Sequence, residues 1–143
     1  MQVLKFGGTS VANADNIKKA AAIVEAAVKK DKTVVVVSAL GGITDTLISC
    51  GTLAAAGDEK YKEKLYEAEH RHLDTVKALL PVTQQSSILS LVKQRCNELE
   101  DICHGVFMLK ELSARTHDRI VSYGESLSSQ NCCRRMNTPR PYE

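Results

Sequence analysis

The sequence predicts an α/β fold in which helices cover a parallel sheet, and three observations lead to this expectation. Residues 2–6 contain a short apolar run that is typical of a first strand. Residues 33–37 form a run of β-branched side chains, and its continuous apolar character predicts a second strand buried on both faces. The segment between them has helical spacing, so the three elements form the right-handed βαβ unit that joins neighbouring parallel strands.

Composition places the chain among ordinary globular proteins. Its 143 residues fit one compact domain, with 43% hydrophobic and 25% charged residues. The net charge of +2 and the 4% of aromatic residues favour neither nucleic acid nor a membrane surface as a partner. No apolar run reaches the roughly 20 residues of a membrane span. Met1 leads directly into strand-like sequence without a signal peptide, so a cytoplasmic location is expected.

The first helix is expected to begin with a cap at Asn13 or Asp15 and to run to about Lys30. Its apolar residues recur every three or four positions and form one face. A second helix is expected over about 45–56, directly after the second strand and the turn that follows it.

Two helices without a strand between them are expected next. The first begins at a cap on Asp58 and ends before Pro81, and the second covers about 84–109. Together they predict a helical excursion from the sheet over about 58–110. A last helix, capped by Thr116, carries the remaining informative residues.

The five cysteines do not have the spacing of a metal site. Cys96 and Cys103 share one face of a helix but lie roughly 10 Å apart along it, beyond the reach of a disulfide. We expect the cysteines to be small buried side chains. His70 and His72 diverge on a helix and make a poor pair of ligands, so the sequence predicts no metal ligands.

The segment Lys5-Phe6-Gly7-Gly8-Thr9-Ser10, where the first strand ends, predicts a phosphate-binding turn. Glycine amides approach an anion closely because no Cβ stands in the way, and Lys5 adds a mobile positive charge. Thr9 and Ser10 bring hydroxyls that either donate to the anion or cap the helix whose N-terminus faces the same place. The order differs from the P-loop, in which the lysine follows the glycines.

A second turn of the same kind, Ser38-Ala39-Leu40-Gly41-Gly42-Ile43-Thr44-Asp45, follows the second strand. Its two glycines expose backbone amides, and Ser38 and Thr44 bring hydroxyls, although Thr44 is also placed to cap the next helix. Ligands bind outside the carboxyl ends of parallel strands. The two turns are therefore expected to form one site for a polyanion or an amino acid.

Gly124 and Glu125 form the third candidate segment, inside the last helix. A glycine at a helix interior costs roughly 1 kcal/mol relative to alanine, which indicates close packing or the close approach of a ligand. A lone Glu on a helix is most often a solvated residue. Beside Gly124, however, Glu125 is a candidate to accept a hydrogen bond from a substrate ammonium group.

These segments resemble the three N-terminal signatures of aspartokinases: Lys5 to Val11, Val37 to Thr44, and Ser122-Tyr123-Gly124-Glu125. The opening residues and the helix around Cys103-His104-Gly105 are most similar to the bifunctional aspartokinase–homoserine dehydrogenases. The resemblance covers residues 1–129, which we take as the N-terminal part of a catalytic domain, and residues 130–143 as an atypical tail. Pro139 and Pro141 argue against an ordinary helix in that tail.

The resemblance implies the amino-acid kinase fold, a three-layer α/β/α sandwich, and transfer of the ATP γ-phosphate to the β-carboxylate of L-aspartate. It implies that Lys5, Gly7 and Gly8 hold the phosphates, with Lys5 as the catalytic cation. It implies that Ser38 and Thr44 contact aspartate or the phosphoryl group, and that Glu125 binds the amino group. Mg²⁺ and a homo-oligomer, expected to be a dimer, are implied as well.

Aspartokinases are longer than this chain, so we expect the 143 residues alone to lack kinase activity. Two other interpretations stay open at this point. One is an amino-acid kinase acting on glutamate, carbamate or a nucleoside monophosphate, against which the Ser-Tyr-Gly-Glu segment argues. The other is a regulatory or assembly module that keeps the fold without the chemistry, against which the presence of Lys5 and Glu125 argues.

Overall fold

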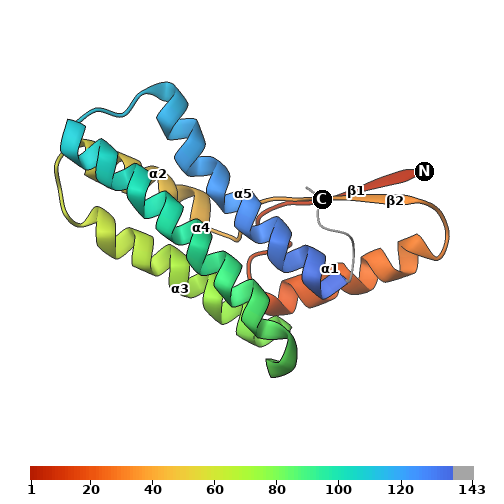
Figure 1. Ribbon diagram of the computed structural model, residues 1–143. Helices are drawn as coiled ribbons and strands as arrows, with labels where there is room; N and C mark the ends of the chain where they lie inside the picture. Colours follow the sequence, from red (N-terminus) through yellow and green to blue (C-terminus); the bar gives the residue numbers. More distant parts are fainter. Residues whose placement is uncertain (137–143) are drawn as a thin grey trace.

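The computed structural model describes residues 1–136. It has two strands and five helices in the described part, and α5 runs from α2, α3 and α4 toward β2 and α1 (Figure 1). The elements are β1 Gln2–Phe6, α1 Ala14–Val28, β2 Thr33–Val37, α2 Ile43–Ala55, α3 Tyr61–Leu79, α4 Val82–Leu109 and α5 Ala114–Met136. No helix among residues 1–136 is long and apolar enough to cross a membrane.

The strands β1 and β2 pair in parallel, as the βαβ pattern predicts, with Lys5 opposite Val36 and Phe6 opposite Val37. Side chains alternate between the two faces of a strand. Phe6 is buried and Val37 packs beside it against the core, where the apolar face of α1 also lies. The described sheet therefore has one covered face.

The predicted burial of β2 on both faces is wrong for the described residues. Val34 and Val36 are 47% and 44% exposed, while Val35 and Val37 pack against the core. A run of β-branched residues suits any strand. It does not distinguish a strand covered on two faces from one covered on a single face.

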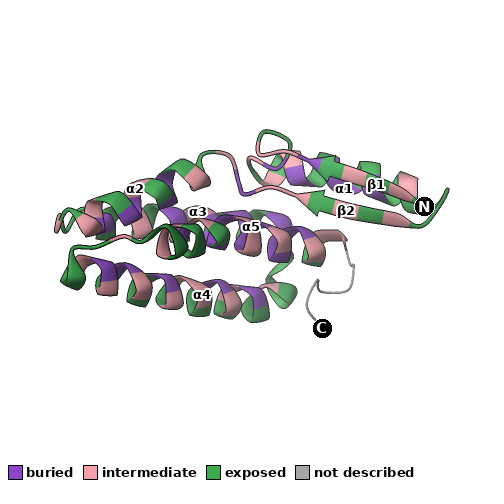
Figure 2. Cartoon of the chain, turned by 90° about the horizontal axis from the view of Figure 1, so that it is seen from above, coloured by how far each residue is buried: buried purple, intermediate pink, exposed green. Residues whose placement is uncertain are grey.

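The helical excursion over about 58–110 is confirmed by α3 and α4, which pack against each other and against α2 and α5. Buried residues lie on the inward faces of these helices, and exposed residues on the outward faces (Figure 2). Helix α5 contacts all four other helices and β2. It thereby links the helical body to the sheet and carries Gly124 and Glu125 toward the strand ends.

Of the predicted helix caps, the one at α1 is confirmed and those at α3 and α5 are wrong. Asn13 caps α1, and its side chain accepts a hydrogen bond from the Asn16 N–H at 3.0 Å. Asp58 is not the N-cap of α3, which is Lys60, but its carboxylate accepts a hydrogen bond from the Lys60 N–H at 2.9 Å. The prediction of Thr116 as the cap of α5 is wrong, because the Ser113 hydroxyl accepts from the Thr116 N–H at 3.2 Å.

The predicted boundary at residue 129 does not coincide with the end of a helix, because α5 continues to Met136. Buried Asn131 and Cys132 belong to this last part of α5. The argument from Pro139 and Pro141 concerns residues outside the described part.

Candidate functional site

The two glycine turns lie against each other at the ends of the paired strands. The Ser38 N–H donates to the Phe6 carbonyl at 3.0 Å, which extends the pairing of the strands into the turns. A Cβ placed on Gly8 would lie 3.6 Å from the Ala39 carbonyl oxygen and 3.9 Å from Ser38 Oγ. A Cβ placed on Gly41 would lie 3.5 Å from the Gly8 carbonyl oxygen. The predicted proximity of the two turns is therefore present in the structure.

Backbone hydrogen bonds shape the first turn. The Gly7 carbonyl accepts from the N–H groups of Ser10 at 2.9 Å and Val11 at 3.2 Å, and Val11 is fully buried beneath the turn. The Asn16 side chain donates to the Thr9 carbonyl at 2.8 Å and ties the turn to α1. Thr9 and Ser10 are exposed, and since Asn13 caps α1 their hydroxyls are not used as helix caps.

The second turn leads directly into α2. Gly42 has a φ of +80° and precedes the first residue of the helix, a conformation that residues with a Cβ seldom adopt. Thr44 lies in the first turn of α2 and is not its cap. Among the described residues, no backbone acceptor serves the N–H groups of Thr44 and Asp45. Free amides at a helix N-terminus are suited to an anion.

Gly124 brings the third segment onto the second turn. A Cβ placed on it would lie 3.0 Å from the Cβ of Ala39 and 3.5 Å from Cγ2 of Ile43. The close packing predicted from a glycine inside a helix is thus found, and the packed neighbour is the second turn. Glu125 follows on α5, where it lines a groove of about 850 Å³ between α5 and β2.

Lys5 lies on the uncovered face of the sheet. It alternates with buried Phe6 along β1 and shares its face with Val36, its partner on β2. Val36 in turn lines the groove that contains Glu125, although Lys5 itself does not line it. Within residues 1–136 Lys5 makes no ion pair, so its charge is available to a ligand.

Arg71 is a cation of the site that sequence reasoning missed. Its Nη2 donates to the Ala12 carbonyl at 3.5 Å, and its Nη1 would lie 3.5 Å from a Cβ on Gly42. It therefore lies beside both the segment that follows the first turn and Gly42 of the second turn. No sequence motif marks Arg71, because it lies beside the apolar stripe of a helix that is well separated in sequence from both turns. The packing of α3 against α2 brings Arg71 near the two turns.

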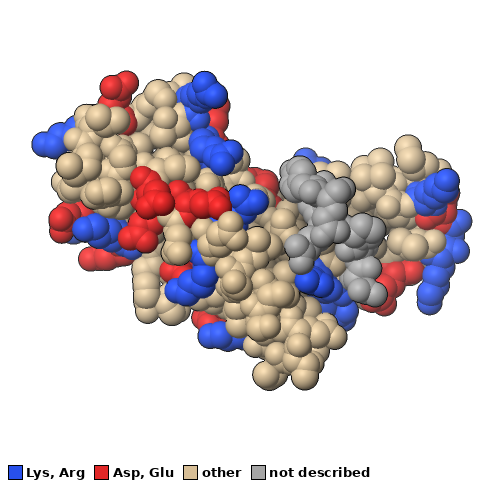
Figure 3. All heavy atoms as spheres, in the orientation of Figure 1, with Lys and Arg blue, Asp and Glu red and all other residues tan. Residues whose placement is uncertain are grey.

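Side chains of α4 and α5 fix the wall of the groove beside Glu125. Arg95 lines the groove and pairs with Glu98 at 2.9 Å, and this hydrogen bond, foremost among several causes, lowers the pKa of Glu98. The Tyr123 hydroxyl donates to the same carboxylate at 3.4 Å. Acidic and basic side chains both occur over the face of the molecule in Figure 3.

Four of the five cysteines, Cys50, Cys96, Cys103 and Cys132, are structural side chains rather than nucleophiles. Cys50, Cys103 and Cys132 are buried, as expected, while Cys96 and Cys133 are half-buried. Burial raises the pKa of Cys50, Cys96, Cys103 and Cys132 to about 12, so these thiols are protonated at neutral pH. No group of three metal-ligating side chains occurs among residues 1–136.

Comparison with known proteins gives consistent matches. The amino acid kinase family matches residues 1–139. Aspartokinase 1, chloroplastic, from Arabidopsis thaliana is 35% identical over 95% of this chain, and 23% of the relative is covered. The bifunctional aspartokinase/homoserine dehydrogenase of Buchnera aphidicola is 30% identical over 90% of the chain, and 16% of the relative is covered.

Solved structures give the same result. E. coli aspartokinase III, crystallised in complex with aspartate and ADP, superposes with a TM-score of 0.81 and 26% identity. The match covers 96% of this chain and 29% of that one. The chain thus spans less than a third of the length of the relatives that it matches, and over that length the fold is the same.

Proposed function

We propose that this chain, which belongs to the amino acid kinase family, forms the phosphate- and aspartate-binding part of an aspartokinase. The reaction is transfer of the ATP γ-phosphate to the β-carboxylate of L-aspartate. One observation carries the proposal above all others: the two glycine turns and the Gly124 segment, far apart in sequence, pack against one another at one end of the sheet. The relative of known structure with aspartate and ADP supports the choice of substrates.

In this proposal the turns hold the phosphates of ATP. The amides of Gly7 and Gly8, the free amides at the start of α2 and the hydroxyls of Thr9 and Ser10 donate to phosphate oxygens. Lys5 neutralises the charge that moves with the transferred phosphoryl group, and Arg71 adds a second cation. Phosphoryl transfer depends mainly on positioning and charge neutralisation, which these groups supply.

The aspartate lies on the α5 side in this proposal. Glu125 accepts hydrogen bonds from the substrate ammonium group. Ser38 and Thr44, at opposite ends of the second turn, contact the reacting carboxylate or the phosphoryl group. Both are half-buried, which limits the conformations of their hydroxyls.

Mg²⁺ is part of the proposal but has no cage of protein ligands among residues 1–136, where no group of three ligating side chains occurs. In phosphoryl-transfer sites Mg²⁺ is bound mainly by substrate phosphates and water, with one or two carboxylates. When bound, the ion neutralises phosphate charge. The chain's own residues then have to position the two substrates.

Calorimetric titration of the chain with ATP in the presence of Mg²⁺ tests the phosphate site. Replacing Lys5 with Ala removes a charge-assisted contact, and we expect affinity to fall by about tenfold or more. Lys18→Ala is the matched control, because Lys18 is an exposed lysine of α1 whose one ion pair within residues 1–136 is with exposed Asp15. Equal affinity in the two variants would contradict the role of Lys5.

A second titration tests the amino-acid side of the site. We expect Glu125→Gln to weaken L-aspartate binding by about tenfold, since an ammonium loses its charged partner, while ATP binding stays unchanged. If Glu125→Gln instead weakens ATP and leaves aspartate unaffected, the assignment of the two sides is wrong.

Three narrower expectations stay predictions. Because the chain spans less than a third of the length of its relatives, we propose that the 143 residues alone do not turn over substrate. Aspartate-dependent ATP hydrolysis by this chain would refute this.

The expected homodimer is tested by light scattering, which measures the mass of the protein in solution. A cytoplasmic location is expected from the sequence, although several relatives are chloroplastic proteins.

A further inference from the structure

The last turns of α5 have a different buried surface from the rest of the helix. Up to Leu127, its buried side chains are aliphatic or aromatic. Among residues 128–136, the α5 end, three of the four buried side chains are polar, namely Ser128, Gln130 and Asn131. Burial of apolar surface is the main force that holds packed helices together. The α5 end is therefore held less firmly than the first part of the helix.

The buried polar groups between the α5 end and α3 are only partly satisfied. The side-chain nitrogen of Asn131 lies 3.4 Å from Nδ1 of His72, and both residues are buried. Within residues 1–136, neither Asn131 Oδ1 nor His72 Nε2 has a hydrogen-bond partner. Water would serve both atoms if the α5 end moved away from α3, so their burial destabilises the docked position relative to an open one.

The remaining contacts of the α5 end are weak. Arg135 pairs with Glu25 of α1 at 4.0 Å, and Arg134 Nη2 donates to Ser87 Oγ of α4 at 3.4 Å. Both contacts are long and involve solvent-accessible side chains, and such contacts add little to stability. Local opening with the rest of the fold intact occurs where few buried apolar contacts hold a segment, and the α5 end meets this condition.

Protonation of His72 acts against the docked position. The amide nitrogen of Asn131 donates, so Nδ1 of His72 accepts and the ring proton is on Nε2. A second proton, on Nδ1, would place two donors against each other and would leave a charged ring buried between helices. Burial, and to a lesser extent the like charge of Arg71, lowers the pKa of His72 to about 4.

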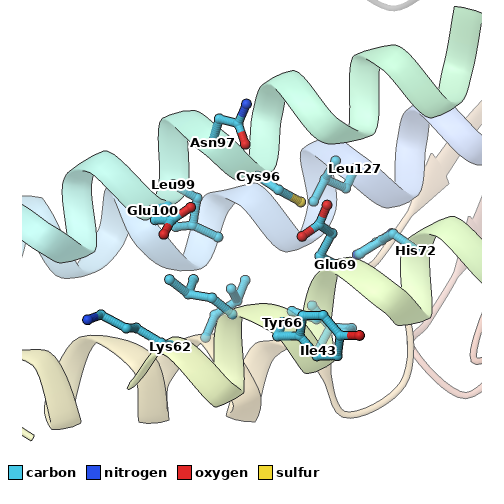
Figure 4. Close-up of a pocket in the computed structure, with 13 residues that line it drawn as sticks. Ile43, Lys62, Tyr66, Glu69, His72, Cys96, Asn97, Leu99, Glu100 and Leu127 are labelled. Carbon is cyan, nitrogen blue, oxygen red and sulfur yellow. The ribbon is translucent and has the colours of Figure 1, made fainter. Parts of the chain in front are cut away.

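Other charged groups around His72 do not compensate for its protonation among residues 1–136. Glu69, on the preceding turn of α3, directs its carboxylate toward α4 and forms an ion pair with Lys93 there (Figure 4). Lys62 and Glu100 line the pocket that His72 borders, but they are exposed and of opposite sign. Residues of α2 and α5 in this lining, and the buried side chains of α1, are apolar. The other titratable groups in the lining, uncharged at neutral and acid pH, are Tyr66 and Cys96.

We propose that the α5 end is an acid-sensitive switch, which opens from the other helices as one unit and stays open when His72 is protonated. Opening removes one wall of the groove that contains Glu125, because Ser129, Cys132 and Met136 line that groove. The first part of α5 stays docked through its buried apolar side chains. Helical segments as short as the α5 end are unstable without packing, so its backbone hydrogen bonds open with it.

Amide hydrogen exchange of the full chain, expressed as protection factors, tests the proposal. At pH 7 we expect the amides of residues 132–136 to share one protection factor, about tenfold or more below that of residues 120–127. Between pH 7 and pH 5 this shared factor should fall about tenfold to twentyfold, because the open state binds a proton that the docked state excludes. Equal protection in both parts of α5, a gradual decline toward the helix end as in simple fraying, or no change with pH would each overturn the proposal.

Two further measurements separate the role of His72 from that of the opening itself. His72→Gln should abolish the fall in protection between pH 7 and pH 5, whereas His104→Gln, at an exposed histidine of α4, should retain it. A fall that survives His72→Gln would contradict the switch.

The wild-type chain reports the opening if that variant does not fold. At pH 7 a thiol reagent should modify Cys132, which is 2% exposed, at least tenfold faster than Cys103 of α4, which is 0% exposed, because Cys103 becomes accessible only when the packed helices separate. Equal rates at the two thiols would rule out local opening of the α5 end.

Discussion

Gly124 and Gly105 both interrupt long helices, but the space beside them differs. A Cβ on Gly124 would lie 3.0 Å from the Cβ of Ala39, whereas nothing lies within 4 Å of a Cβ on Gly105. The helix-forming advantage of alanine over glycine, about 1 kcal/mol, is common to both positions. Overpacking, which typically costs 1–3 kcal/mol, applies only at Gly124.

We therefore expect the two alanine variants to change stability in opposite directions. Gly105→Ala should raise the free energy of unfolding by about 0.5–1 kcal/mol, and Gly124→Ala should lower it by about 1 kcal/mol. Urea denaturation followed by circular dichroism measures both. Stabilisation by both variants would mean that α5 does not pack closely on the second turn.

His72 makes stability depend on pH. Burial, and to a lesser extent Arg71, lowers the pKa of this histidine from 6.5 to about 4. The unfolded chain binds a proton below pH 6.5 that the folded chain excludes, so stability is fully present above pH 6.5. It falls as pH decreases toward 4, by up to roughly 3 kcal/mol.

Unfolding measured at pH 7 and pH 4.5 tests this dependence. We expect His72→Gln to flatten the difference between the two pH values. His104→Gln, which replaces an exposed histidine of α4, should leave it as in the wild type. A wild-type chain and a His72→Gln variant that lose the same stability on acidification would rule out His72 as the source.

At the scale of single elements, the first residues of the helices show which capping residues can be predicted from the sequence and which cannot. Asn13 was one of two candidates for the cap of α1 and is the residue used. For α5, Ser113 and Thr116 are both suitable hydroxyl residues three positions apart. Only the backbone path after α4, which turns at Lys110 with a φ of +52°, decides that Ser113 meets the free N–H.

Two conservative variants test the cap of α5. Ser113→Ala removes the acceptor of the Thr116 N–H and should cost about 1 kcal/mol of stability. Thr116→Val keeps that backbone bond, although it loses the 2.9 Å contact between the two hydroxyls, and should cost less. Thermal unfolding measures both, and a larger loss for Thr116→Val would restore Thr116 as the cap.

The elements of the site were predictable because each turn carries its own local signal. Glycines with neighbouring hydroxyls mark both turns, and the unfavourable glycine in α5 marks the third segment. The position of Arg71 and the buried contact between His72 and Asn131 were not predictable, since both arise from the way α3 packs against residues far away in the sequence. Local patterns report backbone conformation, whereas side-chain proximity between helices depends on their crossing geometry.

At the scale of the whole molecule, α5 joins two parts of different character. The β1–α1–β2 unit supplies the strand ends, and α2, α3 and α4 form a helical body beside it. The parallel pairing and the helical excursion followed from the order of the elements. The exposure of Val34 and Val36 could not be predicted, because a continuous apolar run has no alternation of apolar and polar residues from which the covered face could be inferred.

The central claim is that two turns distant in sequence act as one anion site. Backbone NMR of the labelled chain titrated with ATP and Mg²⁺ tests it most directly. The amides of Gly7, Gly8, Gly41 and Gly42 should shift together and give a single dissociation constant. Later addition of L-aspartate should move the amides of Gly124 and Glu125. Shifts at only one turn, or different dissociation constants for the two turns, would contradict the account.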